Sequence, residues 1–381
     1  HVYDTREQAV RLLWKESIHD PRYWAGEVSE VLYDPIEDLI YIARGDGHDR
    51  LGVYTLTREA RAERVAGEPV LKGAIHLDHA CFTLHGPGEW HPFRGITCIE
   101  LGTRRRVTAM FNPDTAPSPD GHGVDKPRAG SVSSVYTRLA VMVRGGLVYG
   151  DPLSGEDLTF YRLLDFYPSH YGPLRVNTVI VSGAPLTAWN MMTHSTVVGS
   201  DEMVSDLQRR SRDLVAPSLL VYFDGPTPRI VGSMGARVTS IEVVGGEVLI
   251  GSSTAPNLER YDVTRLDAGV RSLNLLSLDS ILTSNPPPVT IRPPRESYAG
   301  ARAFGGVPLR GYRRPIIRVK SRGGGRLTVY SYMIGDPPGS AEADTYTLEE
   351  GWNTIDLSGH HGYIVSFSVE ARADDVRIML S

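Results

Sequence analysis

The chain of 381 residues is predicted to be an all-β protein, with a β-propeller followed by a small antiparallel β-sandwich. Stretches beginning at Glu27 and Arg237 align: each reads as an apolar strand, a tight turn, a second apolar strand, another turn and a third strand with a Tyr. A repeated meander of this kind is the unit of a propeller. The 39 glycines and 26 prolines are typical of short strands joined by many turns. The meander spacing predicts five blades, or six if residues 218–233 form their own blade.

The segment before the first meander has a different pattern. Within residues 5–17, Ala9, Leu12 and Leu13 lie at helical spacing, which predicts a helical segment over residues 1–20. From residue 21 to residue 283, short apolar runs alternate with turns, and this range is assigned to the propeller.

Two polar insertions interrupt the propeller range. Residues 112–132 are rich in Pro and Gly and are predicted to form an exposed loop. Residues 188–213 contain a stretch with an acidic beginning and an Arg-rich end, which predicts a helix with Ser200 as its N-cap.

The C-terminal part of the chain changes character again. The Pro-rich segment 284–297 is predicted to be a stiff linker. Residues 298–381 alternate apolar and polar side chains and contain regular turns, which predicts a small antiparallel sandwich.

Composition limits the function. A net charge of −5 argues against nucleic acid as a partner, because phosphate neutralisation needs a concentrated basic surface. The chain has no apolar run of about 18 residues, so no membrane span is expected. The N-terminus lacks the apolar region of a signal peptide, which predicts a cytoplasmic protein, with secretion left open if the N-terminus is processed. Cys81 and Cys98 are predicted to be buried thiols, the alternative being a bridge between neighbouring strands. We expect no cofactor and no bound metal.

In a propeller the first strands of all blades surround one axis, and polar side chains at their entrance ends form a pocket. The segment His76–His79 stands out, because His76 and Asp78 share one face of a strand while His79 lies on the other. It predicts an acid–base or metal-binding pair on the axis, or alternatively a structural contact between blades. The remaining axial candidates are Glu27, Ser29, Glu30, Tyr136, Arg138, Asn177, Arg237, Thr239 and Glu242.

A second candidate site lies in residues 187–203, which contain Trp189, Asn190, His194 and Glu202. An aromatic face beside carboxylates and amides is typical of a sugar site. The alternative is that Trp189 packs in a core and the acidic residues begin a helix. The loop 86–95, with Trp90, is predicted to rim a pocket, or else to be an ordinary packed loop.

The stretch from Phe223, FDGPTPRIVGSMGARVTSIEVVGGEVLIGSST, together with the repeats, resembles an uncharacterised archaeal β-propeller family, which implies no assigned activity. The layout of a five-bladed propeller and a sandwich is also similar to that of glycoside hydrolases acting on fructans and arabinans. That resemblance implies inner-strand carboxylates acting as nucleophile or base, as acid and as transition-state stabiliser. The Trp-x-Asn-Asp-Pro-Asn opening of the fructan group is absent from this chain.

The hypothesis from sequence is a carbohydrate-active enzyme that hydrolyses glycosides with a carboxylate pair. Alternatives are a non-catalytic propeller that binds a protein or glycan, and a metal-dependent lactonase-like hydrolase centred on the histidines. Expected partners are a carbohydrate or other small-molecule substrate and, beyond that, a protein partner or a second copy. The predicted catalytic residues are Asp78, His79, Glu202 and Glu242, and the predicted substrate-binding residues are His76, Trp90, Arg138, Trp189, Asn190 and His194.

Overall fold

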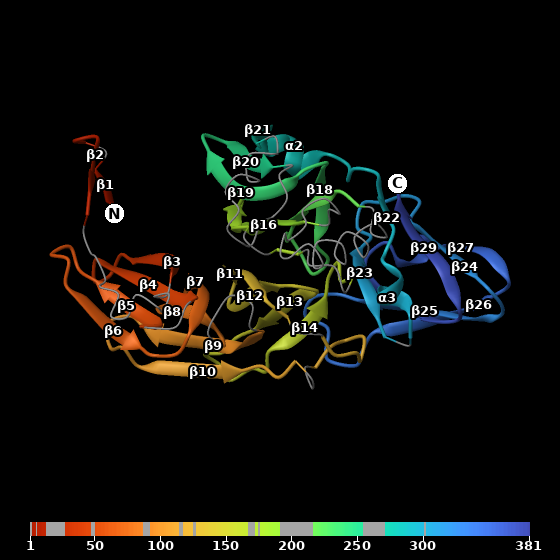
Figure 1. Cartoon of the computed structure of the whole chain (residues 1–381), viewed down its shortest axis with the longest axis horizontal. Helices are drawn as coiled ribbons and strands as arrows, with labels where there is room; N and C mark the ends of the chain where they lie inside the picture. Colours follow the sequence, from red (N-terminus) through yellow and green to blue (C-terminus); the bar gives the residue numbers. More distant parts are fainter. Residues whose placement is uncertain are drawn as a thin grey trace, which may run out of the picture. The chain divides into compact units, whose positions relative to one another are not determined.

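The fold is described by a computed structural model (Figure 1). It covers residues 2–4, 6–12, 27–46, 50–86, 92–113, 117–124, 127–166, 172–173, 176–190, 216–253, 271–300 and 302–381. Contacts divide the chain into two compact units. Unit 1 comprises residues 1–113, 126–141 and 150–158, and unit 2 comprises residues 114–125, 142–149 and 159–381.

The first meander sheets follow the chain in simple antiparallel order, β3-β4-β5-β6, β10-β9-β8-β7 and β11-β12-β13-β14. Their strands are β3 (Glu27–Asp34), β4 (Leu39–Asp46), β5 (Gly52–Leu56), β6 (Ala62–Ala66), β7 (Val70–His76), β8 (His79–His85), β9 (Phe93–Glu100), β10 (Arg106–Met110), β11 (Ala129–Val135), β12 (Arg138–Val143), β13 (Gly146–Gly150) and β14 (Thr159–Arg162). Each four-stranded meander is of the kind found in a propeller blade.

Two further meanders belong to unit 2, with orders β15-β16-β17-β18 and β19-β20-β21. Their strands are β15 (Val179–Val181), β16 (Ala184–Trp189), β17 (Ser218–Tyr222), β18 (Arg229–Met234), β19 (Arg237–Val244), β20 (Glu247–Ser253) and β21 (Arg271–Ser277). Residues 218–233 therefore complete the sheet that starts at β15 and are not a blade of their own. In the described part of the chain, five meander sheets lie between residues 27 and 277, which agrees with the five-bladed, propeller-like fold predicted.

The repeat that predicted the fold is visible in the strands. The copy at Glu27 forms β3-β4-β5, and the described part of the copy at Arg237 forms β19 and β20. The expected third strand of the second copy falls on residues outside those described. After β20, β21 ends at Ser277 and the helix α2 (Leu278–Thr283) follows it.

The C-terminal part forms two four-stranded antiparallel sheets, with orders β22-β29-β24-β27 and β23-β28-β25-β26. Their elements are β22 (Val289–Ile291), α3 (Arg295–Tyr298), β23 (Phe304–Pro308), β24 (Ile316–Ser321), β25 (Gly325–Tyr332), β26 (Glu342–Leu348), β27 (Gly351–Asp356), the 3-10 turn Ser358–His360, β28 (Ile364–Glu370) and β29 (Ala373–Leu380). Two such sheets are what the predicted sandwich requires. Part of the expected Pro-rich linker is an edge strand, because β22 pairs with β29.

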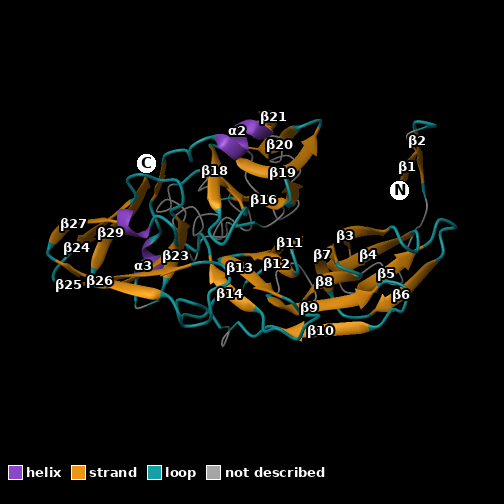
Figure 2. Cartoon of the chain, turned by 180° about the vertical axis from the view of Figure 1, so that it is seen from behind, coloured by secondary structure: helices purple, strands orange, loops and turns teal. Residues whose placement is uncertain are grey.

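The predicted N-terminal helix is wrong for residues 2–4 and 6–12, and residues 13–20 of that segment lie outside the described residues. Residues 2–11 form a hairpin of β1 (Val2–Asp4) and β2 (Ala9–Arg11), with Tyr3 opposite Val10. Val10 and Leu12 are exposed, so the apolar spacing has no core to face. A helix this short is marginal in water without packing. The described helices, α2 and α3, both lie in the C-terminal half (Figure 2). No helix among the described residues is long and apolar enough to span a membrane.

The core of unit 1 lies between its first two sheets. Tyr41 and Val53 from the first sheet and Val70 and Phe82 from the second are all fully buried, and the rings of Tyr41 and Phe82 lie 6.4 Å apart. Within this unit β7 lies against both β3 and β11. The first strands of three successive meanders are therefore neighbours, as the propeller argument requires, and their polar side chains share one region.

The two cysteines are bonded to each other, which corrects the prediction of free buried thiols. Cys81 on β8 and Cys98 on β9 are direct cross-strand partners, their Cα atoms lie 3.9 Å apart, and their sulfur atoms form a disulfide. The 17-residue separation left both readings open, because it did not fix the register of the hairpin.

Candidate functional site

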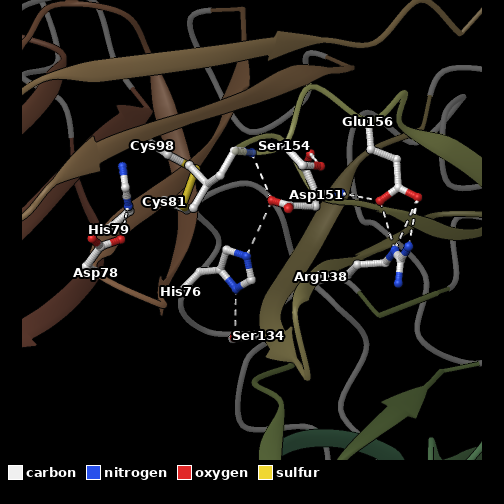
Figure 3. Close-up of polar contacts among 11 residues, drawn as sticks. His76, Asp78, His79, Cys81, Cys98, Ser134, Arg138, Asp151, Ser154 and Glu156 are labelled. Carbon is white, nitrogen blue, oxygen red and sulfur yellow. Dashed lines mark hydrogen bonds and ion pairs between the residues drawn. A yellow bond between two sulfur atoms is a disulfide. The ribbon is translucent and has the colours of Figure 1, made fainter.

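The candidate site is a polar strip of unit 1, defined as Ser29 and Glu30 on β3, Lys72 and His76 on β7, Ser134 on β11, and Asp151, which follows β13. It forms because β3, β7 and β11 lie side by side and place polar side chains between buried apolar ones. Figure 3 shows the part of the strip around His76.

The segment His76–His79 is a hairpin turn, so the predicted strand through it is wrong. His76 ends β7, His79 begins β8, and the two are direct cross-strand partners. Leu77 has φ +53° and is exposed. Two-residue hairpin turns need positive φ and favour Asn, Asp and Gly. The apolar Leu in this position made the sequence read as a strand, and the predicted shared face of His76 and Asp78 does not exist.

His76 is fully buried, and only one of its ring nitrogens is hydrogen-bonded. Its Nδ1 lies 2.8 Å from Ser134 Oγ and its Nε2 lies 3.8 Å from Asp151 Oδ1. Among the described residues Nε2 has no hydrogen-bond partner. Burial lowers the pKa of His76, and the Asp151 charge offsets only part of this effect. The imidazole is therefore neutral at pH 7 and can exchange a proton with Ser134.

Asp78 occupies the exposed turn, and its neighbour His79 is buried. The His79 Nδ1–H donates to Asp78 Oδ1 at 2.6 Å, and this hydrogen bond is the main reason that the pKa of Asp78 lies below its ordinary value. The side chain of Asp78 is 65% exposed. The pair caps the end of the β7–β8 hairpin, with its carboxylate directed away from the core.

Glu30, like Ser134 and Asp151, is a residue of the strip that the selection of catalytic residues missed, although it was named among the axial candidates. Its carboxyl group accepts the Val31 N–H at 3.3 Å and lies 3.9 Å from Lys72 Nζ, while Lys72 donates to the Ser29 carbonyl at 3.1 Å. Burial raises the pKa of Glu30 despite the nearby Lys72 charge. Its place on the first strand was visible in the sequence, but the burial of its carboxyl group was not.

Arg138 is engaged by a protein carboxylate. It pairs with Glu156 in a fork, with Nε at 2.8 Å from Oε2 and Nη2 at 3.1 Å from Oε1. Glu156 Oε2 also accepts the Asp151 N–H at 3.1 Å. Arg138 was predicted to bind substrate, and in this structure it anchors the segment that carries Asp151 (Figure 3).

The predicted sugar platform of unit 2 is not available. Trp189 is 0% exposed and packs against Phe223 with ring centroids 6.5 Å apart, so the alternative of core packing holds. Asn190 is buried and its amide bonds the Val238 backbone, accepting its N–H at 2.9 Å and donating to its carbonyl at 3.0 Å. Asn177 clasps the Ile241 backbone in the same way.

The other predicted site residues belong to different units or lie outside the described residues. Glu242 is exposed on β19 in unit 2, whereas Asp78 belongs to unit 1. Trp90, His194 and Glu202 lie outside the described residues, as does the predicted helix after Ser200. Within the described ranges no group of three or more His, Cys, Asp or Glu side chains is arranged to hold a metal ion.

Unit 2 contains a buried ionic cluster that sequence reasoning did not find. Arg162 is 0% exposed; its Nε lies 2.9 Å from Asp120 Oδ2, its Nη1 donates to Asp165, and its Nη2 donates to the His122 and Gly123 carbonyls. Burial opposes the charge of Arg162, but Asp120 and Asp165 together raise its pKa above the ordinary value. The cluster joins loop residues 120–123 to β14, and nothing in the local sequence links them.

A family model described as "Uncharacterized protein conserved in archaea (DUF2139)" matches residues 1–261. No curated protein matches the sequence. Solved structures give distant likenesses only. A variant of the exo-β-1,3-galactanase of Phanerochaete chrysosporium, in complex with β-1,3-galactotriose, is 8% identical with a TM-score of 0.33, over 93% of this chain and 99% of that chain.

Two bacterial structures are similar to the same extent. A GH43 protein of Bacillus licheniformis is 9% identical with a TM-score of 0.32, over 94% of this chain and 98% of that chain. A GH43 protein of the Bacteroides ovatus xyloglucan locus is 9% identical with a TM-score of 0.29, over the same shares, 94% and 98%. At these TM-scores the likenesses carry no argument, and the chemistry has to be inferred from the residues themselves.

Proposed function

The chain belongs to this uncharacterised archaeal family, and from the geometry of unit 1 we propose that it is a carbohydrate-active hydrolase that cleaves glycosidic bonds. One observation carries the proposal: two carboxyl groups from different segments reach the same first strand, β7. Glu30 on β3 reaches Lys72, and Asp151 reaches His76. Glycoside hydrolysis needs such a pair, one group acting as acid and the other as base or nucleophile.

The environments of the two carboxyl groups divide the roles. Burial raises the pKa of Glu30, which favours the protonated form that donates to a leaving-group oxygen. The backbone N–H of Asp151 donates to Glu156, and the Asp151 carboxylate faces the buried imidazole of His76. We therefore assign the role of base to this carboxylate. Titratable groups in contrasting environments are the usual sign of an acid–base pair.

The spacing along β7 predicts the stereochemistry. Lys72 and His76 are four residues apart, which is about 13 Å along an extended strand. The carboxyl groups of retaining enzymes are about 5–5.5 Å apart, and those of inverting enzymes about 6.5–9.5 Å. The wider of these two ranges fits positions this far apart better, so we expect inversion of the anomeric centre.

The test is a panel of chromogenic and oligosaccharide glycosides assayed with the full chain. We expect Glu30→Gln and Asp151→Asn each to reduce kcat by roughly 10²–10⁴-fold. Asp38→Asn is the matched control, because it changes an exposed carboxylate of the neighbouring β3–β4 hairpin. Asp78→Asn tests the role predicted from the sequence, and loss of activity there would move the base from Asp151 to Asp78. NMR of the first product that shows retention would contradict the spacing argument.

A second candidate, hydrolysis of an acyl ester or lactone, is favoured by the contact between Ser134 and His76. A hydroxyl 2.8 Å from a neutral imidazole, with a carboxylate 3.8 Å beyond it, has the order of a nucleophile, a base and an orienting acid. Ser134 Oγ would attack the carbonyl carbon and pass its proton to His76, which returns it to the leaving alcohol. Water would then release the acyl group from Ser134.

The two candidates make opposite predictions for two variants. Ser134→Ala abolishes ester hydrolysis and leaves glycoside hydrolysis intact if both ideas hold, whereas Glu30→Gln does the reverse. Activity on neither substrate class, together with glycan binding by the wild-type chain, would replace both by a non-catalytic binding function.

A further inference from the structure

The outer face of the sheet β22-β29-β24-β27 carries a cluster of cations around one tryptophan. Ile317 and Val319 on β24, and Val376 and Ile378 on β29, are fully buried, so alternation directs the residues between them outward. These outward residues, with Arg292 after β22 and Trp352 on β27, form what we call the basic face: Arg292, Arg318, Lys320, Arg377 and Trp352.

Trp352 is the centre of the basic face. Its side chain is 40% exposed, and the guanidinium carbons of Arg318 and Arg377 lie 4.7 Å and 5.1 Å from its ring centroid. A guanidinium that stacks on an aromatic ring keeps its N–H edge free for an anion. The ring therefore acts as a support that orients two arginines and not as a bare stacking surface.

In the described part of the chain, carboxylates of the protein balance two of the four cations of this face. Asp375 accepts from Arg292 at 3.2 Å and from Arg377 at 2.9 Å. Among the described residues no carboxylate forms an ion pair with Arg318 or Lys320, and Arg318 Nε is buried without a hydrogen-bond partner. The other acid on the outward side of β27 is Asp356 at the strand end, whose carboxylate accepts the Ser358 N–H.

The register of the sheet places two arginines directly opposite each other, and a bound anion would relieve their repulsion. Arg318 and Arg377 are direct cross-strand partners, and like charges in that position are destabilising. Lys320 lies opposite Trp352 on one side and opposite Asp375 on the other. Arg318 and Lys320 are two residues apart on β24, about 6.6 Å along the strand, so these two cations form a short row that matches repeated anionic groups.

We propose that the basic face binds an acidic polysaccharide, with carboxylates of the glycan paired to Arg318 and Lys320. Bidentate pairing of guanidinium with carboxylate gives the specificity. Single-stranded nucleic acid is disfavoured, because it needs open aromatic faces for its bases and both arginines cover Trp352. The cations of the basic face would attract any polyanion, and the choice of a polysaccharide among polyanions rests on the proposed function.

The test measures binding of polygalacturonate to the full chain by isothermal titration calorimetry. We expect Arg318→Gln combined with Lys320→Gln to weaken binding at least tenfold, and wild-type affinity to fall as salt rises. Arg326→Gln is the matched control, because this exposed arginine lies on β25 of the other sheet and pairs with Glu370. Equal binding by the double variant and the control would overturn the proposal.

Further arms separate the ligand classes and the two proposals. A neutral galactan that binds as tightly as polygalacturonate, or an oligo-dT that binds more tightly, would overturn the choice of an acidic glycan. The melting temperature of Arg318→Gln should be unchanged or higher, because a like-charge contact is removed, and a clear fall would indicate a structural arginine instead. Hydrolysis of small neutral glycosides should be unaffected by the double variant, so failure of the hydrolase proposal leaves this result interpretable.

Discussion

His76 in unit 1 and Arg162 in unit 2 are both fully buried ionisable side chains, but their surroundings differ. Arg162 donates to two carboxylates and two carbonyls, and its partner Asp120 accepts further bonds from Ser118 and the His122 N–H. His76 has one hydrogen bond, at Nδ1. A buried charge with its donors engaged holds segments together, whereas a neutral imidazole with an open nitrogen remains available for proton transfer.

The largest effect is expected at Arg162, whose buried ion pairs should contribute strongly to the free energy of unfolding. Arg162→Met leaves Asp120 and Asp165 buried without their cation, and removing one partner of a buried ion pair costs about 3–5 kcal/mol. We expect a loss of that size in the free energy of unfolding, measured by urea denaturation of the full chain. A change below about 1 kcal/mol would show that the cluster is not structural.

The second prediction concerns the disulfide, which should raise the melting temperature of the sheet that carries His76. Cys81 and Cys98 lie on β8 and β9, in the same sheet as His76. A bridge that closes a loop of this length contributes about 3 kcal/mol. We expect the Cys81→Ala, Cys98→Ala variant to melt at a lower temperature and the wild type in reductant to approach it. Equal melting of wild type and variant without reductant would contradict a stabilising bridge.

The third prediction is that the free energy of unfolding depends on pH through His76. Because burial lowers its folded pKa, the unfolded chain binds more protons below about pH 6.5. Stability is therefore fully present above that pH and falls as the pH decreases. His122 also has a lowered pKa from burial, so the measurement is the difference between wild type and His76→Asn in unfolding free energy from pH 7.5 to 5. Parallel curves would show that His76 does not titrate on unfolding.

The smallest effect is expected at the exposed pair of Arg138 and Glu156. The two side chains are 43% and 39% exposed, and such pairs contribute about 0.2–1 kcal/mol. Arg138→Met should therefore change the unfolding free energy far less than Arg162→Met. It should still reduce hydrolase activity if the pair positions Asp151, so kcat and stability are measured on the same preparation. A large fall in stability would remove the contrast between exposed and buried arginines.

The sequence predicted what depends on local alternation and on repetition. The strands of β3 and β4 follow from the apolar runs after Glu27 and Leu39, and the second copy repeats them at Arg237. Failures occurred where the outcome depends on distant neighbours. The spacing of Ala9 and Leu12 indicated a helix, but no core lies beneath it.

The candidate site was only partly predictable for the same reason. His76 and Glu30 were placed on first strands, but Ser134 and Asp151 come near His76 only because β7 and β11 are adjacent. Leu77 concealed a turn, since an apolar residue at positive φ is uncommon. The sequence neighbours of Trp189 are typical of a sugar-binding site, but its ring is covered by packing against Phe223, which is distant in the sequence.

Asn177 and Asn190 both bond main-chain groups at the edge of a sheet. β19 is the edge strand of its sheet, and exposed edge groups invite pairing with strands of other molecules. The two amides occupy the N–H and carbonyl groups of Val238 and Ile241, imitating a neighbouring strand without being one. Val238 and Ile241 are buried, so the two side chains satisfy main-chain groups that water does not reach.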